Sequence, residues 1–476
     1  MPKKRIIGII IVLSVVFVAM FINDAFLKKR QFVIISTNDI HSSIDNIPRL
    51  ATLVKGCRDT IETILLDAGD RWTGGSYVDL AKGRRPILDL LGKVGLTAGA
   101  LGNHEFDMGP SFLDDAIKYS NFSTICCNLK SDTIALNNPK KFLTLRLSNG
   151  LKLFITGVVS TAENSYPEGA KWCFKNLSFC DPILSAHGLL KESRGCDMRI
   201  LLSHMGDVLD CRYASEYGEY DLIIGGHTHA VVDTLVNGVT IGQTGLKLKR
   251  AGLTLVKFRG RKIESIAYRN IDLTTLSEDS VISNHVRRIK DNPELARKVG
   301  SLSHGLNFIG MANLITSIIK DATYSDIGIY HYGGIRLSSL PKGDVPLCAA
   351  TDIDPFHSQI VILEMTAEQI RKAILAKYND TGNVKDSHQI DLMASVPYTI
   401  VTDAKDNAVD VIFPTLDSRK KYRVALSDYV ANQYPGLEYS SRTDSEIYVI
   451  DAINHTLEKH SPLDISCEPK QSKIVR

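Results

Sequence analysis

The chain has 476 residues, of which 44% are hydrophobic and 23% are charged. This length is too great for one ordinary hydrophobic core, so we expect a globular protein of about two domains. Its 56 basic and 53 acidic residues leave a formal net charge of +3, which gives no global reason to expect nucleic-acid binding.

The first 30 residues have the pattern of an export signal. Basic residues at positions 3–5 precede an uncharged apolar run, Ile6–Ile22, and basic residues at positions 28–30 follow it. The run is near the lower limit of about 17–25 residues that spans a bilayer, and no small-x-small cleavage site follows it. We interpret residues 1–30 as an uncleaved membrane anchor, with a removed signal peptide as the alternative. The rest of the chain is then expected to be periplasmic or at the cell surface.

Short apolar runs predict four buried strands, each followed by polar residues at its carboxyl end. The predicted strands are Phe32–Ser36, Thr63–Leu66, Met198–Leu202 and Asp221–Ile224. Helices are expected between them, at Pro86–Val94 and Phe112–Tyr119. Because α/β sheets build their sites at the carboxyl ends of strands, we expect the polar residues to meet there.

A second domain is predicted after a connector. The charged segment Ser280–Gly300 has a helical pattern and no strand signal. Mixed patterning resumes beyond it, with strands at Asp326–Tyr330, Ile360–Glu364 and Tyr422–Leu426 and a helix at Ala367–Lys377. The predicted division is therefore a first domain at 31–280, a connector at 281–300 and a second domain at 301–476.

The polar strand ends together form a candidate metal site. The stretches T-N-D-I-H, D-A-G-D, G-N-H-E, L-S-H-M and G-G-H-T-H supply the candidate ligands Asp39, His41, Asp70, Asn103, His204, His227 and His229. Any one of them alone would be explained as a structural residue. Oxygen and imidazole ligands without thiolates suit Zn, Mn or Fe. Seven ligands fit two divalent ions that share a carboxylate, with Asp70 as the candidate. Such a pair can clamp a phosphoryl group and lower the pKa of a bridging water.

These motifs resemble a known superfamily. The series D-I-H, G-D, G-N-H-E-F-D-x-G, a lone H and G-H-T-H is similar to the calcineurin-like metallophosphoesterases, over roughly residues 32–245. The F-D-x-G extension and the two-domain layout resemble bacterial 5′-nucleotidases and UDP-sugar hydrolases. The resemblance implies an α/β fold: a four-layer sandwich of two packed mixed sheets flanked by helices, followed by a smaller mixed α/β domain.

The resemblance also implies roles for individual residues. It implies that one ion is held by Asp39, His41, Asp70 and His229, and that a second is held by Asp70, Asn103, His204 and His227. It further implies that His104, oriented by Asp107, stabilises the transition state or protonates the leaving oxygen. For Glu105 we expect no more than a hydrogen bond to a ligand.

The second half resembles the C-terminal domain of the nucleotidases less closely. Y-G-G-I-R at Tyr332–Arg336 resembles the family's N-G-G-G-I-R, which implies that Arg336 meets the phosphate or sugar of the substrate. D-P-F-H at Asp354–His357 resembles L-P-F-x-N, which places His357 beside the expected asparagine.

The chain departs from the family where the nucleobase would be bound. Both positions at which the family stacks an aromatic ring on the base fall on leucines, Leu392 and Leu437. Such stacking contributes about 1–3 kcal/mol per base. Base recognition is therefore expected to be weaker, unless Tyr434 or Tyr439 takes over.

The sequence thus predicts an exported dimetal hydrolase of small phosphoesters, acting through a metal-bridging hydroxide. Nucleoside 5′-phosphates or related nucleotides are the substrates that the resemblance implies. The alternatives are a hydrolase of other phosphomonoesters, phosphodiesters or sulfur oxyanions, and a membrane-tethered metal-binding protein without catalysis. No basic stripe interleaved with aromatic residues favours nucleic acid.

The nine cysteines include no C-x-x-C pair, so a thiolate metal site is not expected. Most are expected to be buried thiols. Cys173 and Cys180 are the candidates for a disulfide.

Overall fold

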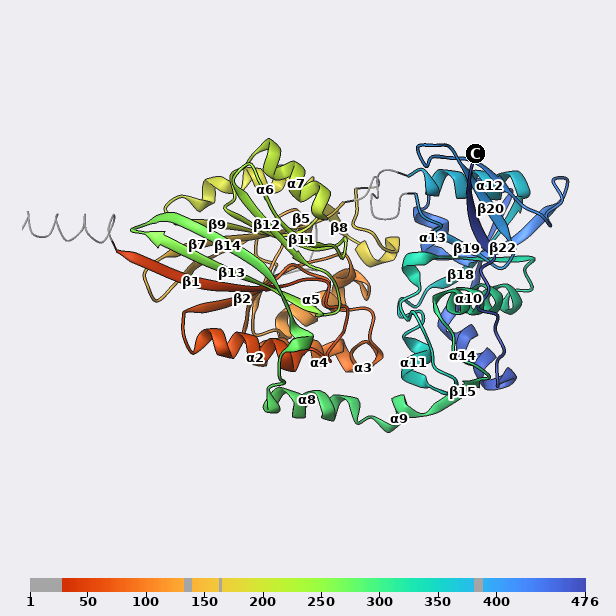
Figure 1. Cartoon of the computed structure of the whole chain (residues 1–476), viewed down its shortest axis with the longest axis horizontal. Coiled ribbons are helices and arrows are strands. Elements are labelled where there is room, and N and C mark those ends of the chain that lie inside the picture. The colour runs from red at the N-terminus through yellow and green to blue at the C-terminus, as the bar shows by residue number, and fades with distance from the viewer. Residues whose placement is uncertain (1–27, 132–138, 162–164, 381–387) are drawn as a thin grey trace, which may run out of the picture. The chain divides into compact units, whose positions relative to one another are not determined.

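The computed structural model describes residues 28–131, 139–161, 165–380 and 388–476 (Figure 1). The predicted anchor, Ile6–Ile22, lies outside these ranges. Within them, no helix combines the length and the apolar character that a membrane crossing requires. The chain forms two compact units: most of the chain up to Arg287 belongs to the first, and Arg288–Arg476 belongs to the second. Two short stretches, Trp72–Arg84 and Glu168–Trp172, group with the second unit.

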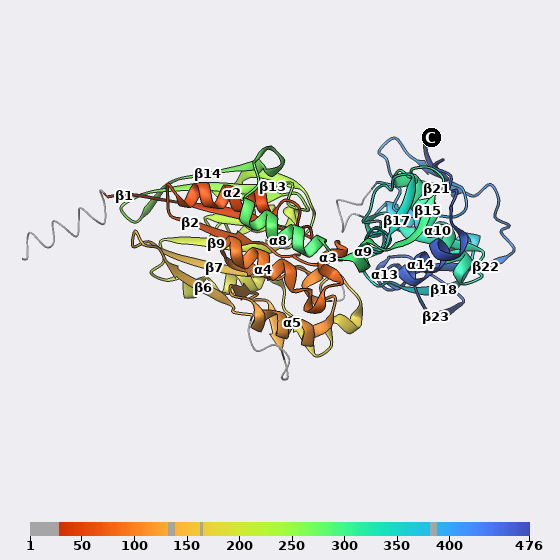
Figure 2. The same ribbon diagram turned by 90° about the horizontal axis from the view of Figure 1, so that it is seen from below.

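The first unit contains two mixed six-stranded sheets (Figure 1, Figure 2). The first sheet has the order β14-β13-β1-β2-β3-β4 and the second β11-β12-β10-β9-β7-β6. The strands of the first sheet are β1 (Lys29–Thr37), β2 (Thr63–Asp67), β3 (Leu96–Ala100), β4 (Ser123–Ile125), β13 (Arg250–Arg259) and β14 (Lys262–Asp272). Those of the second are β6 (Phe142–Arg146), β7 (Lys152–Val159), β9 (Met198–His204), β10 (Leu222–Gly225), β11 (Val231–Val236) and β12 (Val239–Thr244).

The core of the first unit lies between the two sheets. Side chains alternate along a strand, so Phe32 and Ile34 of β1 point to one face. Both are fully buried in an apolar cluster that also contains Ile200 and Leu202 of β9. The inner faces of the two sheets therefore pack against each other, as in a β-sandwich.

Helices cover the outer faces of both sheets. Helices α2 (Ile47–Arg58) and α4 (Arg85–Val94) lie on the first sheet, and α6 (Pro182–Gly188) and α7 (Asp207–Glu216) lie on the second (Figure 1). Tyr213 of α7 is fully buried in a cluster with residues of β7, β9 and β10. The layers are helix, sheet, sheet and helix, so the expected four-layer sandwich is confirmed.

Parallel neighbours bring their carboxyl ends to one edge of each sheet. In the first sheet Thr37 pairs with Asp67, and Asp67 pairs with Gly99. In the second, Ser203 of β9 pairs with Gly225 of β10. The loops that follow these strand ends carry the predicted ligands.

The second unit is a smaller mixed α/β structure, as expected. Its five-stranded sheet has the order β19-β16-β22-β18-β23, and a three-stranded sheet has the order β21-β20-β24. The strands are β16 (Ile327–His331), β18 (Gln359–Thr366), β19 (Leu392–Ala394), β20 (Tyr398–Thr402), β21 (Ala408–Ile412), β22 (Lys421–Ser427), β23 (Ser441–Tyr448) and β24 (Gln471–Val475). Its longer helices are α10 (Phe308–Ala322), α12 (Ala367–Tyr378) and α14 (Val449–His460).

The predicted connector Ser280–Gly300 is helical over most of its length, but a strand that the sequence did not indicate begins in its last three residues. Helix α8 (Ser280–Lys290) is followed by a one-turn helix, α9 (Pro293–Ala296), which the Asn292 side chain caps. Strand β15 (Lys298–Leu302) then pairs with β17 (Gly343–Pro346). The strand was missed because its partner lies more than 40 residues further along the chain, beyond any local pattern.

Candidate metal centre

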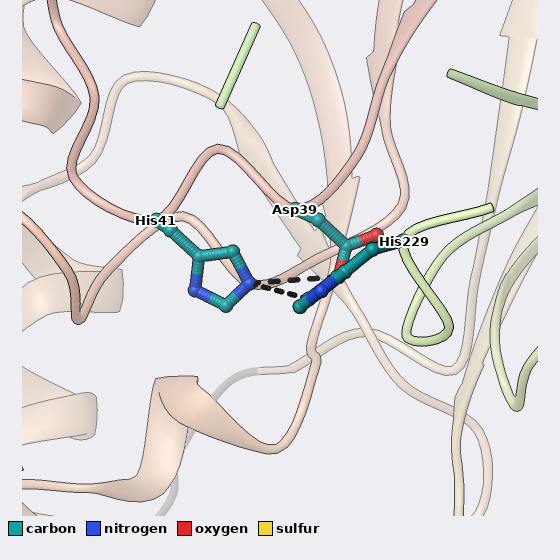
Figure 3. A group of neighbouring side chains, drawn as sticks. All are labelled: Asp39, His41 and His229. Atoms are coloured by element: carbon teal, nitrogen blue, oxygen red, sulfur yellow. Dashed lines mark hydrogen bonds and ion pairs between the residues drawn. The ribbon is translucent and has the colours of Figure 1, made fainter. Parts of the chain in front are cut away.

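Three predicted ligands converge at one point of the first unit (Figure 3). Asp39 and His41 follow β1, and His229 follows β10. Nε2 of His41 lies 2.9 Å from Nε2 of His229 and 3.8 Å from Oδ1 of Asp39. Nε2 of His229 is 3.5 Å from the same Asp39 oxygen. These atoms are close enough to coordinate a common ion.

Asp70 joins this group to a second one. Its Oδ2 atom lies 3.9 Å from Nε2 of His41 and 3.0 Å from Nε2 of His204. Asp39, Asp70 and His204 form another set whose potential ligand atoms all lie within 4.8 Å of one another. The Asp70 carboxylate therefore occupies the position of a shared ligand.

The last two predicted ligands lie beside His204. Nδ1 of His227 is 3.2 Å from Oδ1 of Asn103, and the rings of His204 and His227 are 5.3 Å apart. The backbone N–H of His227 also donates to the Asp39 carboxylate, at 3.0–3.1 Å. All seven candidate ligands predicted from the sequence thus lie close together, beside the carboxyl ends of the parallel strands of the two sheets.

The chemistry of His204 fits a bound cation. Its Nδ1 lies 2.7 Å from the carbonyl oxygen of Ala68, so Nδ1 carries a proton and donates it there. Its buried Nε2 makes no hydrogen bond of acceptable geometry within the described residues, although it faces Asp70. A neutral imidazole nitrogen and a carboxylate oxygen both present lone pairs, and a cation between them satisfies both.

Without a bound cation, protons on the ligand side chains offset the negative charge of the carboxylates. Burial alone would lower the pKa of His204, but the neighbouring Asp70 and Asp39 carboxylates outweigh it and raise that pKa to about 10. Burial also raises the pKa of Asp39. Cation binding at this centre is therefore expected to release protons.

The ligands are held in an unusual backbone conformation. Five of them have a positive φ: Asp39 (49°), His41 (49°), Asp70 (59°), His227 (83°) and His229 (57°). Side chains other than glycine adopt this left-handed region rarely, and it concentrates at functional sites. At Gly226 a Cβ atom would lie 2.8 Å from Nδ1 of His204, so this position has no room for a larger residue.

The predicted catalytic pair borders the centre. Nδ1 of His104 lies 2.8 Å from Oδ2 of Asp107, and the backbone N–H of His104 donates to Oδ1 of Asp70 at 2.9 Å. His104 also belongs to a set with His41 and Asp70 whose potential ligand atoms lie within 4.8 Å of one another. The imidazole is thus oriented by a carboxylate and lies close enough to act on a group bound at the centre.

The four predicted substrate residues lie in the second unit, in different surroundings. The guanidinium carbon of Arg336 is 4.9 Å from the ring centroid of Phe356, and His357 is exposed. Leu392 is only 4% exposed and belongs to an apolar core cluster, against which the half-buried Leu437 packs. Leu392 thus serves the core and offers little surface on which a base could stack.

An aromatic group that the sequence analysis did not assemble lies in the same unit. The ring of His331 is 4.9 Å from that of Tyr429, which in turn is 6.0 Å from that of Tyr434. The Tyr434 hydroxyl donates to Asp391 at 2.6 Å. The position of His331, directly before Y-G-G-I-R, was a signal that could have drawn attention to it.

All nine cysteines are free thiols, so the pairing considered for Cys173 and Cys180 does not occur. Instead the Cys173 thiol donates to the carbonyl oxygen of Asp107 at 3.5 Å.

Comparisons with known proteins agree with this architecture. A family model described as calcineurin-like phosphoesterase matches residues 32–231, and one described as 5′-nucleotidase, C-terminal domain, matches residues 291–439. The chain is 24% identical over 533 residues to protein UshA of Yersinia enterocolitica, covering 94% of each. It is also 24% identical over 480 residues to the trifunctional nucleotide phosphoesterase protein YfkN of Bacillus subtilis. That match covers 84% of this chain, which spans only 32% of YfkN.

The fold has a close counterpart among solved structures. A 5′-nucleotidase precursor from Thermus thermophilus superposes with a TM-score of 0.80 over 94% of this chain and 99% of that one. The sequence identity is 19%, so this likeness concerns the fold alone.

Proposed function

Because the chain belongs to the calcineurin-like phosphoesterases that carry a 5′-nucleotidase C-terminal domain, we propose that it hydrolyses nucleoside 5′-phosphates or related nucleotides. The observation that carries this proposal is the position of Asp70, whose carboxylate faces both His41 and His204. A shared carboxylate of this kind is what a two-cation phosphoester hydrolase requires. A similar protein named 5′-nucleotidase, from Vibrio parahaemolyticus, supports the substrate class.

The residues divide into two sets around Asp70. Asp39, His41, Asp70 and His229 would hold one cation, and Asp70, Asn103, His204 and His227 would hold the other. Two divalent cations bound there would neutralise the phosphoryl oxygens and acidify a water molecule.

His104 and Asp107 supply the proton that the departing alcohol needs. Asp107 accepts from Nδ1 of His104, and in the imidazolium form of His104 the Nε2 atom carries a second proton. When a water oxygen bonds to phosphorus and the ester P–O bond breaks, Nε2 donates this proton to the leaving oxygen. The products are the nucleoside and inorganic phosphate.

In the second unit, Arg336 and His357 are proposed to bind the substrate. The arginine fork suits the phosphate or sugar oxygens. Since leucines stand at both base-stacking positions, we expect the identity of the base to have little influence on the rate. The protein is further proposed to be exported and held at the membrane by residues 1–30, on the basis of their sequence.

A substrate panel tests this function. The full chain, loaded with Mn²⁺ or Zn²⁺, is assayed with AMP, GMP, CMP and UMP and with glycerol phosphate as a matched ester without a base. We expect all four nucleotides to be cleaved, with kcat/KM values within about tenfold of one another, and glycerol phosphate to be cleaved more slowly. Equal or faster cleavage of glycerol phosphate would instead favour a non-nucleotide phosphoesterase.

A further inference from the structure

A buried carboxylate outside the two ligand sets ties together the loops that carry them. Glu105 is 0% exposed, and its Oε2 accepts from the backbone N–H of Gly102 at 2.5 Å and from that of Asp70 at 2.9 Å. Its Oε1 accepts from the N–H of Arg71 at 2.8 Å. Gly102 directly precedes the ligand Asn103, so one side chain fixes the backbone beside two ligands.

Arg71 connects this carboxylate to the strand ends. Its buried guanidinium lies 3.3 Å from Oε1 of Glu105. The Nη1 atom donates at 2.8 Å to Oδ1 of Asp67, which ends β2, and at 2.8 Å to the carbonyl oxygen of Ala100, which ends β3. Asp67 also accepts from the hydroxyl of Thr37 at the end of β1. The network thus spans the carboxyl ends of three adjacent strands.

Stability alone does not explain a buried ion pair of this kind. Removing two charges from water is costly, and well-packed apolar residues are often equally stabilising. An apolar side chain could not, however, accept from three buried N–H groups, which would then lack partners. One of these groups belongs to Asp70, whose φ of 59° needs support from its surroundings.

We propose that Glu105 and Arg71 are positioning residues that hold Asp70 in its left-handed conformation and thereby set the affinity for both cations. This inference rests on the proposed dimetal centre. Glu105 is not itself a ligand, because both of its oxygens face backbone N–H groups and one also faces the guanidinium. Loss of a group that orients a metal ligand typically weakens metal binding about 10–100-fold.

The test compares Mn²⁺ binding by the full-length parent and by Glu105→Gln. The substitution keeps the shape of the side chain but turns an –NH₂ group toward donor N–H groups. Binding is followed by calorimetry, and the spin-coupled pair of ions is followed by electron paramagnetic resonance. We expect both ions to bind about 10–100-fold more weakly and the coupled signal to appear only at correspondingly higher Mn²⁺.

Asp197→Asn is the matched control. The Asp197 side chain is 6% exposed and accepts from the backbone N–H of Lys152 and from the guanidinium of Arg261. Like Glu105, it is therefore a buried carboxylate bound to both a backbone N–H and an arginine. It lies, however, at the starts of β7 and β9, which are the opposite ends of the strands from the metal centre. We expect this variant to lose thermal stability yet to bind Mn²⁺ like the parent.

The outcomes separate the inference from the proposed function. If the parent binds two ions and folded Glu105→Gln binds them with the same affinity, the positioning role is wrong and the centre stands. An equal loss in Asp197→Asn would also overturn it, because the effect would then be general destabilisation. A parent that binds fewer than two ions would contradict the dimetal centre itself. If Glu105→Gln does not fold, Arg71→Lys is measured instead, because it keeps the positive charge but loses the guanidinium bonds to Asp67 and to the carbonyl oxygen of Ala100. We expect weaker Mn²⁺ binding by this variant, and the affinity of the parent would overturn the inference.

Discussion

At the scale of single residues, the centre brings two carboxylates, Asp39 and Asp70, close together although their negative charges repel each other. Hydrogen bonds from neighbouring groups hold both side chains in place. The Asp39 carboxylate accepts from the Asn38 side chain at 2.6 Å and from the His227 backbone, and Asp70 accepts from the His104 backbone. These donors fix the direction of each carboxylate but do not neutralise its charge. Divalent cations would supply the missing charge, and the hydrogen bonds hold the carboxylates in place for them.

Asp70→Asn should abolish most turnover while the fold survives. An amide carries no charge and cannot serve two cations as a carboxylate does, so kcat/KM is expected to fall at least about 100-fold. The measurement is nucleotide hydrolysis at saturating Mn²⁺, with circular dichroism as the check on folding. Asp233→Asn, at an exposed position of β11, is the control and should retain the parental rate. Parental turnover by folded Asp70→Asn would contradict the shared-ligand role.

His104→Ala should lower the rate of hydrolysis most for substrates whose leaving group must be protonated. A general acid contributes about 10²–10⁴-fold for a nucleoside leaving group. Nitrophenolate leaves without being protonated, so the rate of p-nitrophenyl phosphate hydrolysis should fall much less. Asp107→Asn should show the same pattern more mildly, because it removes only the orienting partner. An equal loss on both kinds of substrate would rule out proton donation and leave an electrostatic role.

At the scale of secondary-structure elements, the strand ends that build the centre were predictable from the sequence. The runs within β1, β2, β9 and β10 are buried on both faces, so they appear as uninterrupted apolar stretches. Strands β13 and β14 were not predicted. β13 pairs on one side with β14, the next strand in the chain, and on the other side with β1, which lies more than 200 residues earlier. The pairing of β13 with β1 and of β15 with β17 leaves no local signal, whereas the hairpin of β13 and β14 is local and was overlooked.

The packing of α7 on β9 predicts a pH-dependent stability. Asp210 of α7 is fully buried and accepts from the hydroxyl of Ser203, and burial raises its pKa to about 8. The folded state therefore keeps a proton that the unfolded chain loses near pH 4. The contribution of this group to the free energy of unfolding thus falls as pH rises from about 4 to about 8. Asp210→Asn should remove this fall, as measured by urea unfolding in EDTA between pH 5 and 8. An unchanged pH profile would show that Asp210 is ionised in the folded protein.

At the scale of the whole molecule, the convergence of the candidate metal ligands in the first unit could be predicted, and the surroundings of the candidate substrate residues in the second unit could not. The ligands lie in short motifs after strands, where the local sequence and the sheet edge together determine their position. Leu392 shows the limit: its alignment with a base-stacking position was readable, but its burial in β19 depends on packing against distant residues. The grouping of His331 with Tyr429 likewise joins residues nearly a hundred positions apart.

Metal removal should lower the stability of the whole protein. Ligands that bind only the folded state stabilise it by about 2.7 kcal/mol at one hundred times their dissociation constant. We therefore expect EDTA to lower the Tm of the parent and to leave that of Asp70→Asn nearly unchanged. Differential scanning calorimetry measures both. A parent whose Tm does not respond to EDTA or to added Mn²⁺ would be inconsistent with a built-in metal centre.

The most direct measurement is the number of divalent ions per chain in the active, full-length protein, determined by elemental analysis alongside the rate of AMP hydrolysis. We expect activity to rise with metal content and to reach its maximum at two ions per chain, and Asp70→Asn to remain below this content. Full activity with one ion or none would contradict the claim that seven side chains at the carboxyl ends of two sheets hold a catalytic pair of cations.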